Sequence, residues 1–153
     1  MTHQAYRLSI IYFTLFALLL LTTGATLFFS KIGFSFEAIH NYYAGNEALF
    51  MNAKSTYGQL ETLVPHLGAM GLFIMVMGHF ILFASKKRRK GIVTIFILLF
   101  IAALGDIVSG LFIAKNIGLF IGVKLLSFIA LIGFGYYLSL LVLHEAYLGF
   151  KKA

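Results

Sequence analysis

The chain has 153 residues, of which 61% are hydrophobic, and its mean hydropathy is +0.96. Soluble domains are about 45–50% apolar, so this composition is that of a membrane protein. The absence of Cys excludes disulfides, thiolate metal sites and the covalent attachment of c-type haem. The net charge of +7 does not indicate nucleic-acid binding, because five of the twelve basic residues lie in the single run 86–90, KKRRK.

Four apolar segments are long enough to cross a bilayer, which takes about 20 residues for about 30 Å of hydrocarbon. They lie at about residues 8–30, 63–85, 91–114 and 117–143. The first is too long for a signal peptide and lacks a suitably placed small-residue cleavage site. The connections between the last three segments are short, which makes those segments antiparallel neighbours. We therefore expect an all-α fold, a single integral membrane four-helix up-down bundle over residues 1–153.

The basic run 86–90 sets the expected orientation. Cytoplasmic loops are enriched in Lys and Arg, so this run forms an inner loop whose charges act as a topology signal and contact anionic lipid. Four spans then place both termini inside, in agreement with Arg7 and with the two lysines of the inner tail 144–153. The outer side keeps three scattered lysines, Lys31, Lys54 and Lys115. The sequence thus predicts a multi-pass protein of the bacterial inner (plasma) membrane, with membrane lipid as a partner.

The longest extramembrane piece is the outer loop, residues 31–62. It is rich in Phe and Tyr, which free polar linkers lack. We expect one or two short helices at the interface, the best candidate being residues 36–43 (FEAIHNYY). About thirty residues cannot form an independent core, so the loop packs on its own bundle, on lipid or on a partner. It is a folded cap over the bundle, a docking surface for an external protein, or both. Aromatic side chains dominate such interfaces, and the candidates here are Tyr42, Tyr43, Phe50 and Tyr57.

Two charged residues interrupt the last two spans. Asp106 and Lys124 each lie roughly 10–12 Å below the outer surface at 1.5 Å per residue. An isolated charge at that depth is costly, and antiparallel neighbours can bring two charges together, so we predict a buried ion pair. Other polar residues lie at a similar depth, with His66 just above: Thr22, Thr23, Ser109 and Ser127. This polar layer either fixes the helix register or forms a proton or quinol site that opens outward.

The histidines raise the question of haem b, which needs two imidazoles at similar depth on opposite sides of one iron. His66 and His79 are about 220° apart around their helix, so that helix cannot hold two stacked haems. One haem could involve His79 and His144 near the cytoplasmic ends, although they differ by about 10 Å in depth. His66 could pair with His40 only if the outer loop folds back. We expect no cofactor, and for His79 a hydrogen bond to a neighbouring backbone or hydroxyl group. Haem b on His66, His79 or His144 is the alternative.

No fixed metal-ligand spacing is present, so we expect no metal site. The weak candidates are His40 and His66, with Glu37 or Glu61 as a third ligand. The sequence also lacks a Gly-rich phosphate loop, a nucleophile–base motif and paired catalytic carboxylates, so we do not expect an enzyme.

Glycines recur in the second and fourth spans, where small residues allow close helix contact. Gly68, Gly71 and Gly78 fall on one face of the second span, and the fourth contains Gly118, Gly122, Gly133 and Gly135. A homo-oligomer is compatible with this pattern.

Three short segments carry a resemblance to a known family: YYAGNE (42–47), then Lys54–Ser55, then LETLVPHLGAMG (60–71). They resemble small four-helix bacterial membrane proteins encoded beside periplasmic respiratory enzymes, and among these the NosB-like protein of second-clade nitrous oxide reductase clusters. The resemblance covers about a third of the chain. It implies an accessory or anchoring subunit on the outer face of a respiratory redox system, without catalysis by this chain.

Three functions follow from these observations. The first is a non-catalytic membrane partner that anchors or helps mature a periplasmic redox enzyme through the outer loop. The second is a haem b or quinol-reactive electron-transfer subunit, which would depend on the histidines. The third is a small ion-translocating bundle that uses Asp106 and Lys124.

Overall fold

The computed structural model describes residues 2–84 and 89–151, and describes the side chains of residues 4–81 and 91–147. Its helices are α1 (Thr2–Lys31), α2 (Phe36–Ala44), the short 3-10 helix η1 (Glu47–Leu49), α3 (Thr56–Ala84), α4 (Arg89–Ile113) and α5 (Leu119–Lys151). Most of the basic inner loop expected at 86–90 lies outside the described residues.

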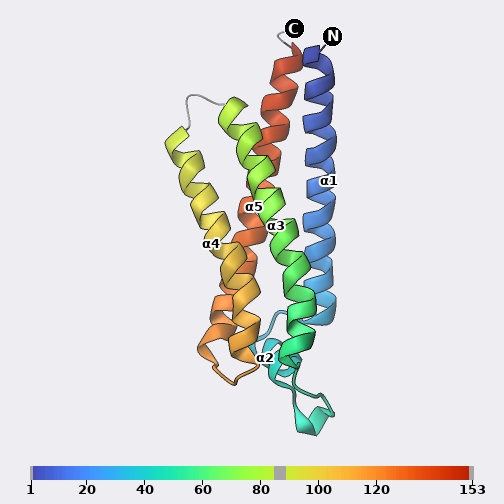
Figure 1. The fold of residues 1–153 in the computed structure, drawn as a ribbon, viewed down its shortest axis with the longest axis vertical. Helices are drawn as coiled ribbons and strands as arrows, with labels where there is room; N and C mark the ends of the chain where they lie inside the picture. Colours follow the sequence, from blue (N-terminus) through green and yellow to red (C-terminus); the bar gives the residue numbers. More distant parts are fainter. Residues whose placement is uncertain (1, 85–88, 152–153) are drawn as a thin grey trace.

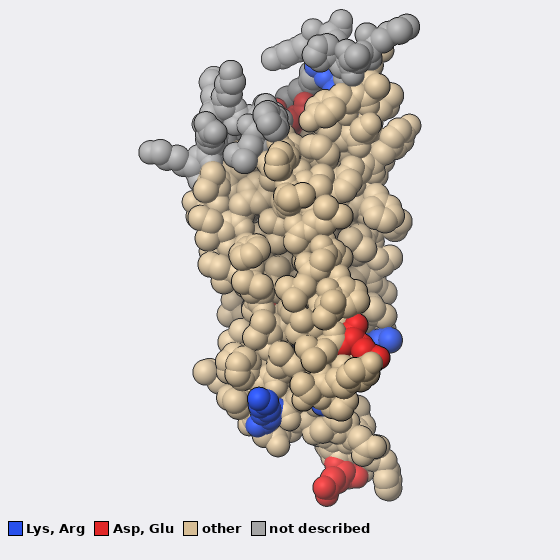
Figure 2. Space-filling model, in the orientation of Figure 1, with Lys and Arg blue, Asp and Glu red and all other residues tan. Residues whose placement is uncertain are grey.

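Four of these helices are long and apolar enough to cross a membrane. The candidate spans are Gln4–Lys31, Thr56–Ile81, Gly91–Ile113 and Leu119–Tyr147. They run up and down side by side, with Thr2 and Lys151 at the same end of the bundle and α2 at the other (Figure 1). The middle of the face shown in Figure 2 carries no charged residue, as a belt facing hydrocarbon requires. The chain is therefore an all-helical integral membrane bundle, and the positive-inside rule predicts that its α2 end faces outward.

α1 begins at Thr2, six residues before the expected start at 8, and the bounds of α3 and α5 also differ from the expected ones. α3 begins at Thr56 and not at 63, so the polar residues expected at the end of the outer loop form its first turns. The Ser55 hydroxyl caps this start by accepting a hydrogen bond from the Gly58 backbone N–H at 3.1 Å. α5 continues to Lys151, well past 143. Hydropathy locates the most apolar part of a helix, and both helices extend beyond that part.

α5 is the central helix, because α1, α3 and α4 all pack against it. In the inner half the helices meet through fully buried apolar side chains, which include Met77, Ile81, Leu99 and Leu138. A second, outer cluster is built around Phe28, Ile39, Ile113 and Phe128, and its Ile39 comes from α2. α2 itself packs on α4 and α5, so it covers one side of the outer end of the bundle.

Only some of the glycines lie at helix contacts. A Cβ at Gly78 would touch the Phe96 ring at 3.4 Å, and one at Gly135 would touch Leu21 at 3.1 Å. The expectation was wrong for Gly68, Gly71, Gly118 and Gly133, where an added Cβ would meet nothing within 4 Å. Gly105 had not been singled out, yet a Cβ there would clash with the Ser127 hydroxyl. This glycine therefore permits the close approach of α4 and α5.

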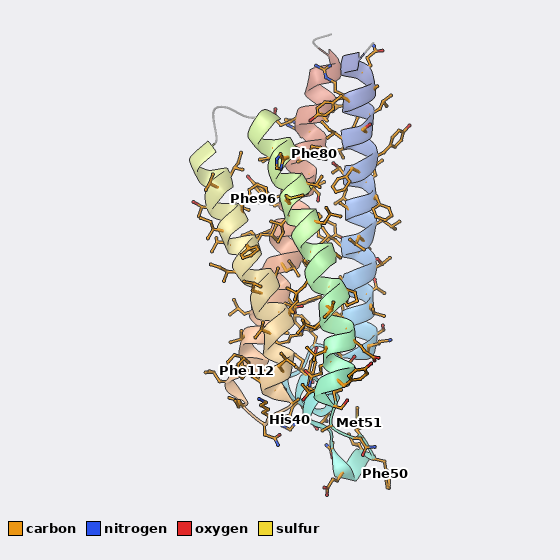
Figure 3. All side chains as sticks on the ribbon, in the orientation of Figure 1. His40, Phe50, Met51, Phe80, Phe96 and Phe112 are labelled. Carbon is orange, nitrogen blue, oxygen red and sulfur yellow. The ribbon has the colours of Figure 1, made fainter. Side chains whose placement is uncertain are left out.

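The segment after α1 contains the helix expected at 36–43, which is observed as α2. The Ser35 hydroxyl caps it by accepting from the Ala38 N–H at 3.0 Å. Beyond α2 the chain turns at Gly45, whose φ of +81° favours glycine. Residues 45–51, which we call the outer tip, are closed by two backbone hydrogen bonds between Asn46 and Met51, at 2.8 and 3.0 Å. Figure 3 shows Phe50 at the far end of this tip, beyond the outer ends of the helices.

Candidate functional site

The two intramembrane charges meet between α4 and α5. Lys124 Nζ lies 2.9 Å from Asp106 Oδ1 and donates a hydrogen bond of 2.7 Å to the Asp106 backbone carbonyl. Both side chains are largely shielded, with 6% of the Lys124 side chain and 14% of the Asp106 side chain exposed. Asp106 Oδ1 receives the ammonium at ion-pair distance but without hydrogen-bond alignment. Pairing offsets the desolvation of the two charges, and Oδ1 retains its capacity to accept hydrogen bonds.

Aromatic rings from two other helices surround the ion pair. Lys124 Nζ lies 5.9 Å from the centroid of the Phe28 ring and 5.7 Å from that of Tyr43. The Tyr43 ring reaches this position because Gly110 has no side chain, since a Cβ there would lie 2.7 Å from a Tyr43 ring carbon. Burial raises the pKa of the Tyr43 phenol above its ordinary value of 10.0, although Lys124 opposes this effect. Tyr43 is therefore a neutral hydrogen-bonding group at physiological pH.

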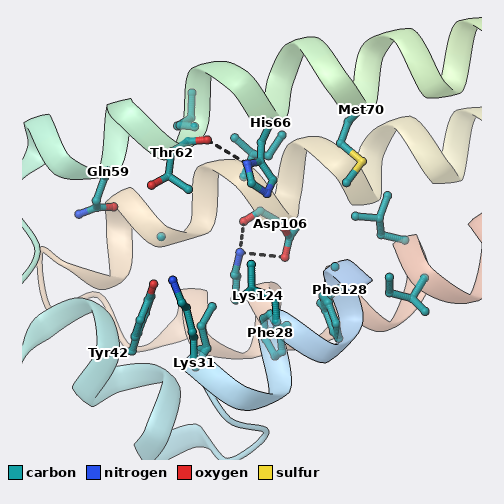
Figure 4. Close-up of a pocket in the computed structure, with 18 of the residues that line it drawn as sticks. Phe28, Lys31, Tyr42, Gln59, Thr62, His66, Met70, Asp106, Lys124 and Phe128 are labelled. Carbon is teal, nitrogen blue, oxygen red and sulfur yellow. Dashed lines mark hydrogen bonds and ion pairs between the residues drawn. The ribbon is translucent and has the colours of Figure 1, made fainter. Parts of the chain in front are cut away.

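A cavity of about 190 Å³ opens beside the ion pair in the outer half of the bundle (Figure 4). Residues from all four membrane helices line it, together with Tyr42, Tyr43 and Lys54 from the outer segment. Its polar lining is concentrated in a few side chains: Lys31, Lys54, Gln59, Thr62, His66, Asp106 and Lys124. Its apolar lining includes Leu20, Leu21, Met70, Phe73 and Leu131. The cavity thus has a polar end near the outer surface and an apolar end deeper in the membrane.

His66 contributes a hydrogen-bond acceptor to this cavity. Its Nδ1 lies 3.0 Å from the backbone carbonyl of Thr62, one turn earlier in α3. A carbonyl can only accept, so Nδ1 carries the proton and, in the neutral ring, Nε2 is an acceptor. Figure 4 shows the ring projecting from α3 toward Asp106.

The polar layer expected across the bundle contains fewer of the predicted residues than their estimated depths suggested. Ser109 is buried and donates to the Asp106 backbone carbonyl at 3.0 Å, so it belongs to the layer. Thr22 shares a hydrogen bond of 2.6 Å with the Tyr136 hydroxyl, and Thr23 donates to carbonyls of its own helix. Neither threonine lines the cavity. The estimated depth had grouped these residues, but Tyr136 lies twelve residues along α5 from Lys124, about 18 Å at 1.5 Å per residue, so Thr22 lies deeper in the bundle than the ion pair.

The remaining histidines whose side chains are described do not gather around a common centre. His79 Nδ1 lies 3.0 Å from the Met75 carbonyl on its own helix. His144 is exposed on α5, and His40 is half-buried on α2. Among the described residues, no group of three His, Cys, Asp or Glu side chains is placed to hold a metal ion, so the weak candidates His40 and His66 are not part of such a group.

The four aromatic docking candidates divide into two pairs. Phe50 is 94% exposed and Tyr57 is 73% exposed, so both are available to a partner. Tyr43 packs against α4, and Tyr42 accepts a hydrogen bond from Lys54 Nζ, which also lies 3.7 Å from the centroid of its ring. Tyr43 therefore attaches the outer segment to the bundle, Tyr42 binds Lys54 within that segment, and both are half-buried.

The sequence did not point to several residues of the outer tip and of the cavity. Leu49 and Met51 are exposed beside Phe50 on the outer tip. Lys31 and Lys54 line the cavity, although they had been counted only as scattered outer charges. The signal that could have found them is their location, because lysines are uncommon on the outer side of a membrane protein.

The fold and the polar cavity define a multi-pass helical membrane protein. The comparison with known families agrees, because a family model described as a transmembrane helical domain, Aq_1264_TM, matches residues 33–152. The chain therefore belongs to the Aq_1264_TM family of transmembrane helical domains. No curated protein and no solved structure matches it.

Proposed function

We propose that this protein is a non-catalytic membrane partner that holds a second protein at the outer face of the bilayer through its outer tip. The observation that carries the proposal is the conformation of Phe50. This side chain is 94% exposed, and its backbone adopts the left-handed region with a φ of 53° and a ψ of 30°. That conformation costs a non-glycine residue roughly 1–2 kcal/mol. A strained residue that displays a large apolar side chain is best explained by a function.

The surroundings of Phe50 favour a protein partner over lipid. The outer tip extends beyond the outer ends of the helices, away from the uncharged belt (Figures 2 and 3). It also carries Glu47, whose carboxylate opposes insertion into hydrocarbon. Leu49 and Met51 add exposed apolar area on either side of Phe50. An apolar centre with polar neighbours is the usual composition of a protein docking site.

The nature of the partner is suggested by the resemblance of residues 42–71 to the NosB-like proteins of nitrous oxide reductase clusters. On that basis the partner is a periplasmic respiratory redox enzyme, which the chain anchors or helps to mature. The membrane is then the bacterial inner membrane. The tip would contribute a small aromatic anchor and leave catalysis to the partner.

Site-specific photocrosslinking in native membranes tests this proposal. A photoreactive residue is placed at Phe50 and, as a matched control, at Leu119, which is 78% exposed near the outer end of α5. We expect one discrete protein adduct from position 50 and none from position 119. An absence of adducts at 50, or the same adducts at both positions, would contradict docking through the tip.

The electron-transfer alternative has one supporting observation, which is the acceptor nitrogen of His66 beside Asp106 and Lys124 in the cavity. Such a group could receive a proton from a quinol hydroxyl. The oxidised and dithionite-reduced visible spectra of the purified chain test the haem version. A Soret band that shifts on reduction and is lost in a His66→Ala, His79→Ala or His144→Ala variant would support it, and a spectrum without such a band would reject it.

A further inference from the structure

In the outer half of the protein, most lysines line the cavity and most acidic residues lie elsewhere. Four lysines lie in that half, Lys31, Lys54, Lys115 and Lys124, and all but Lys115 line the cavity. The acidic residues of the same half are Glu37, Glu47, Glu61 and Asp106, and only Asp106 lines it. Three ammonium groups therefore face one carboxylate.

The excess positive charge lies on Lys31 and Lys54, at the outer end of the cavity, which we call its mouth. Lys124 is paired with Asp106, at 2.9 Å. Lys54 donates to the neutral Tyr42 hydroxyl, which does not balance its charge. Lys31 stands at the outer end of α1, and Figure 4 shows its side chain between Tyr42 and the ion pair. Two cations at the mouth thus have no carboxylate counterpart among the cavity residues, which favours an anionic ligand.

The opposite end of the cavity is suited to an apolar chain. Leu20 and Gly24 of α1 lie on one wall, and Leu63 and Met70 of α3 lie on another. α1 packs mainly on α5, and α3 packs on α4 and α5, so the two walls are not closed against each other by close packing. Leu20 lies about 16 Å deeper along α1 than Lys31 at 1.5 Å per residue. The cavity therefore runs from the membrane surface into the hydrocarbon.

We propose that this cavity binds an anionic amphiphile, with a phosphate or carboxylate head group between Lys31 and Lys54 and its apolar chain between α1 and α3. The cavity, at about 190 Å³, is smaller than the 300–1,000 Å³ typical of sites that enclose a whole small molecule. Part of the ligand must therefore lie in the surrounding lipid. A neutral quinol would leave the charges of Lys31 and Lys54 unmatched. This site is separate from the outer tip, so it stands or falls independently of the docking proposal.

Native mass spectrometry of the full chain in a neutral detergent tests the head-group specificity. The chain is titrated with lysophosphatidic acid, which has one acyl chain and a phosphate head, and with lysophosphatidylcholine of the same chain length. We expect at least tenfold tighter binding of lysophosphatidic acid. Equal binding of the two lipids overturns the proposal, as does tighter binding of a short-chain quinone. Inorganic phosphate that binds as tightly as lysophosphatidic acid also overturns it, because the ligand would then be a soluble anion.

Paired variants locate the site. Lys31→Gln combined with Lys54→Gln should weaken lysophosphatidic acid at least tenfold, whereas Lys115→Gln, on the same side of the membrane, should not change its affinity. Gly24→Leu places a side chain in the apolar end, where a Cβ meets nothing within 4 Å. It should also weaken binding tenfold, whereas Gly68→Leu, which is equally uncrowded but outside the cavity, should not. If Gly24→Leu does not fold, the lysine variants decide. Unchanged affinity in the double lysine variant overturns the proposal.

Discussion

The inner and outer halves of this bundle are built from the same four helices, yet they are organised differently. In the inner half, Met77, Leu99 and Leu138 are fully buried in contact with apolar neighbours. In the outer half, the helices enclose an ion pair and a cavity, and α2 packs on the side formed by α4 and α5. The difference shows how a small membrane bundle can be held by packing at one end and form a polar site at the other. Four predictions test this contrast, in order of decreasing effect on stability.

Removal of one member of the ion pair should have the largest effect. Lys124→Met leaves the Asp106 carboxylate shielded and without its cation, which should destabilise the bundle by about 3–5 kcal/mol. Equilibrium unfolding in mixed micelles measures the change. The double variant Asp106→Asn, Lys124→Met should recover most of the loss, because no unpaired charge remains. A single variant as stable as the double one would show that the pair is not needed for folding.

The same double variant tests ion translocation by the bundle. Reconstituted ion flux that requires both charges should disappear in the double variant. Flux that persists would dispose of that function.

Truncation in the inner half should come second. Leu99→Ala should lower the free energy of unfolding by about 2–3 kcal/mol, near the lower end of values for a buried Leu. When the helices separate in lipid, Leu99 stays in an apolar environment, so the loss comes mainly from its packing contacts and not from the hydrophobic effect. Leu126→Ala, at a position on α5 that is 72% exposed, is the control and should be nearly neutral in the same unfolding assay. Equal losses at both positions would contradict a packed inner core.

Closing the space beneath α2 should have a smaller effect on the outer half. A methyl group at Gly110 would lie 2.7 Å from the Tyr43 ring, so Gly110→Ala should displace α2 and cost about 1–3 kcal/mol. Gly118→Ala adds the same group where nothing lies within 4 Å. Thermal unfolding of both variants and limited proteolysis of residues 32–55 provide the comparison. If Gly110→Ala is as stable and as resistant as Gly118→Ala, Tyr43 does not hold α2 in place.

The smallest change should be a gain in stability at the outer tip. Phe50→Gly relieves the left-handed conformation, whose φ is 53°, and should stabilise the tip by up to about 1 kcal/mol. The gain is reduced by the greater freedom of glycine in the unfolded chain. Hydrogen exchange of the Asn46 and Met51 amides measures local opening, and co-purification of the photocrosslinked partner measures docking. Slower exchange combined with loss of the partner is expected, whereas retention of the partner would remove Phe50 from the docking site.

Much of the architecture can be predicted from local properties of the chain. The four spans follow from length and hydropathy, and the α2 helix follows from the pattern of residues 36–43. The proximity of Asp106 and Lys124 follows from their similar depth on neighbouring antiparallel helices, because a short connection leaves those helices little choice of partner. Each of these inferences depends on residues close in sequence or on a single dimension, the depth in the membrane.

The rotation of each helix about its axis could not be predicted in the same way. A membrane helix is apolar on the face toward lipid as well as on the face toward its neighbours, so the sequence does not mark which face is inside. For this reason Gly68 and Gly71 had been assigned to helix contacts that they do not make. Thr22 had been placed in the polar layer by an estimate of depth, whereas its partner Tyr136 lies about 18 Å deeper along α5 than Lys124.

The sequence by itself thus determined the number of spans and the matching depth of Asp106 and Lys124, and it predicts the orientation, since hydrophobicity and basic residues act on each segment separately. Only the tertiary structure decided that Tyr43 points inward while Phe50 points outward, and that Lys31 and Lys54 converge on the cavity beside Lys124. These arrangements depend on how α2 packs across α4 and α5, which is a contact between segments far apart in the chain.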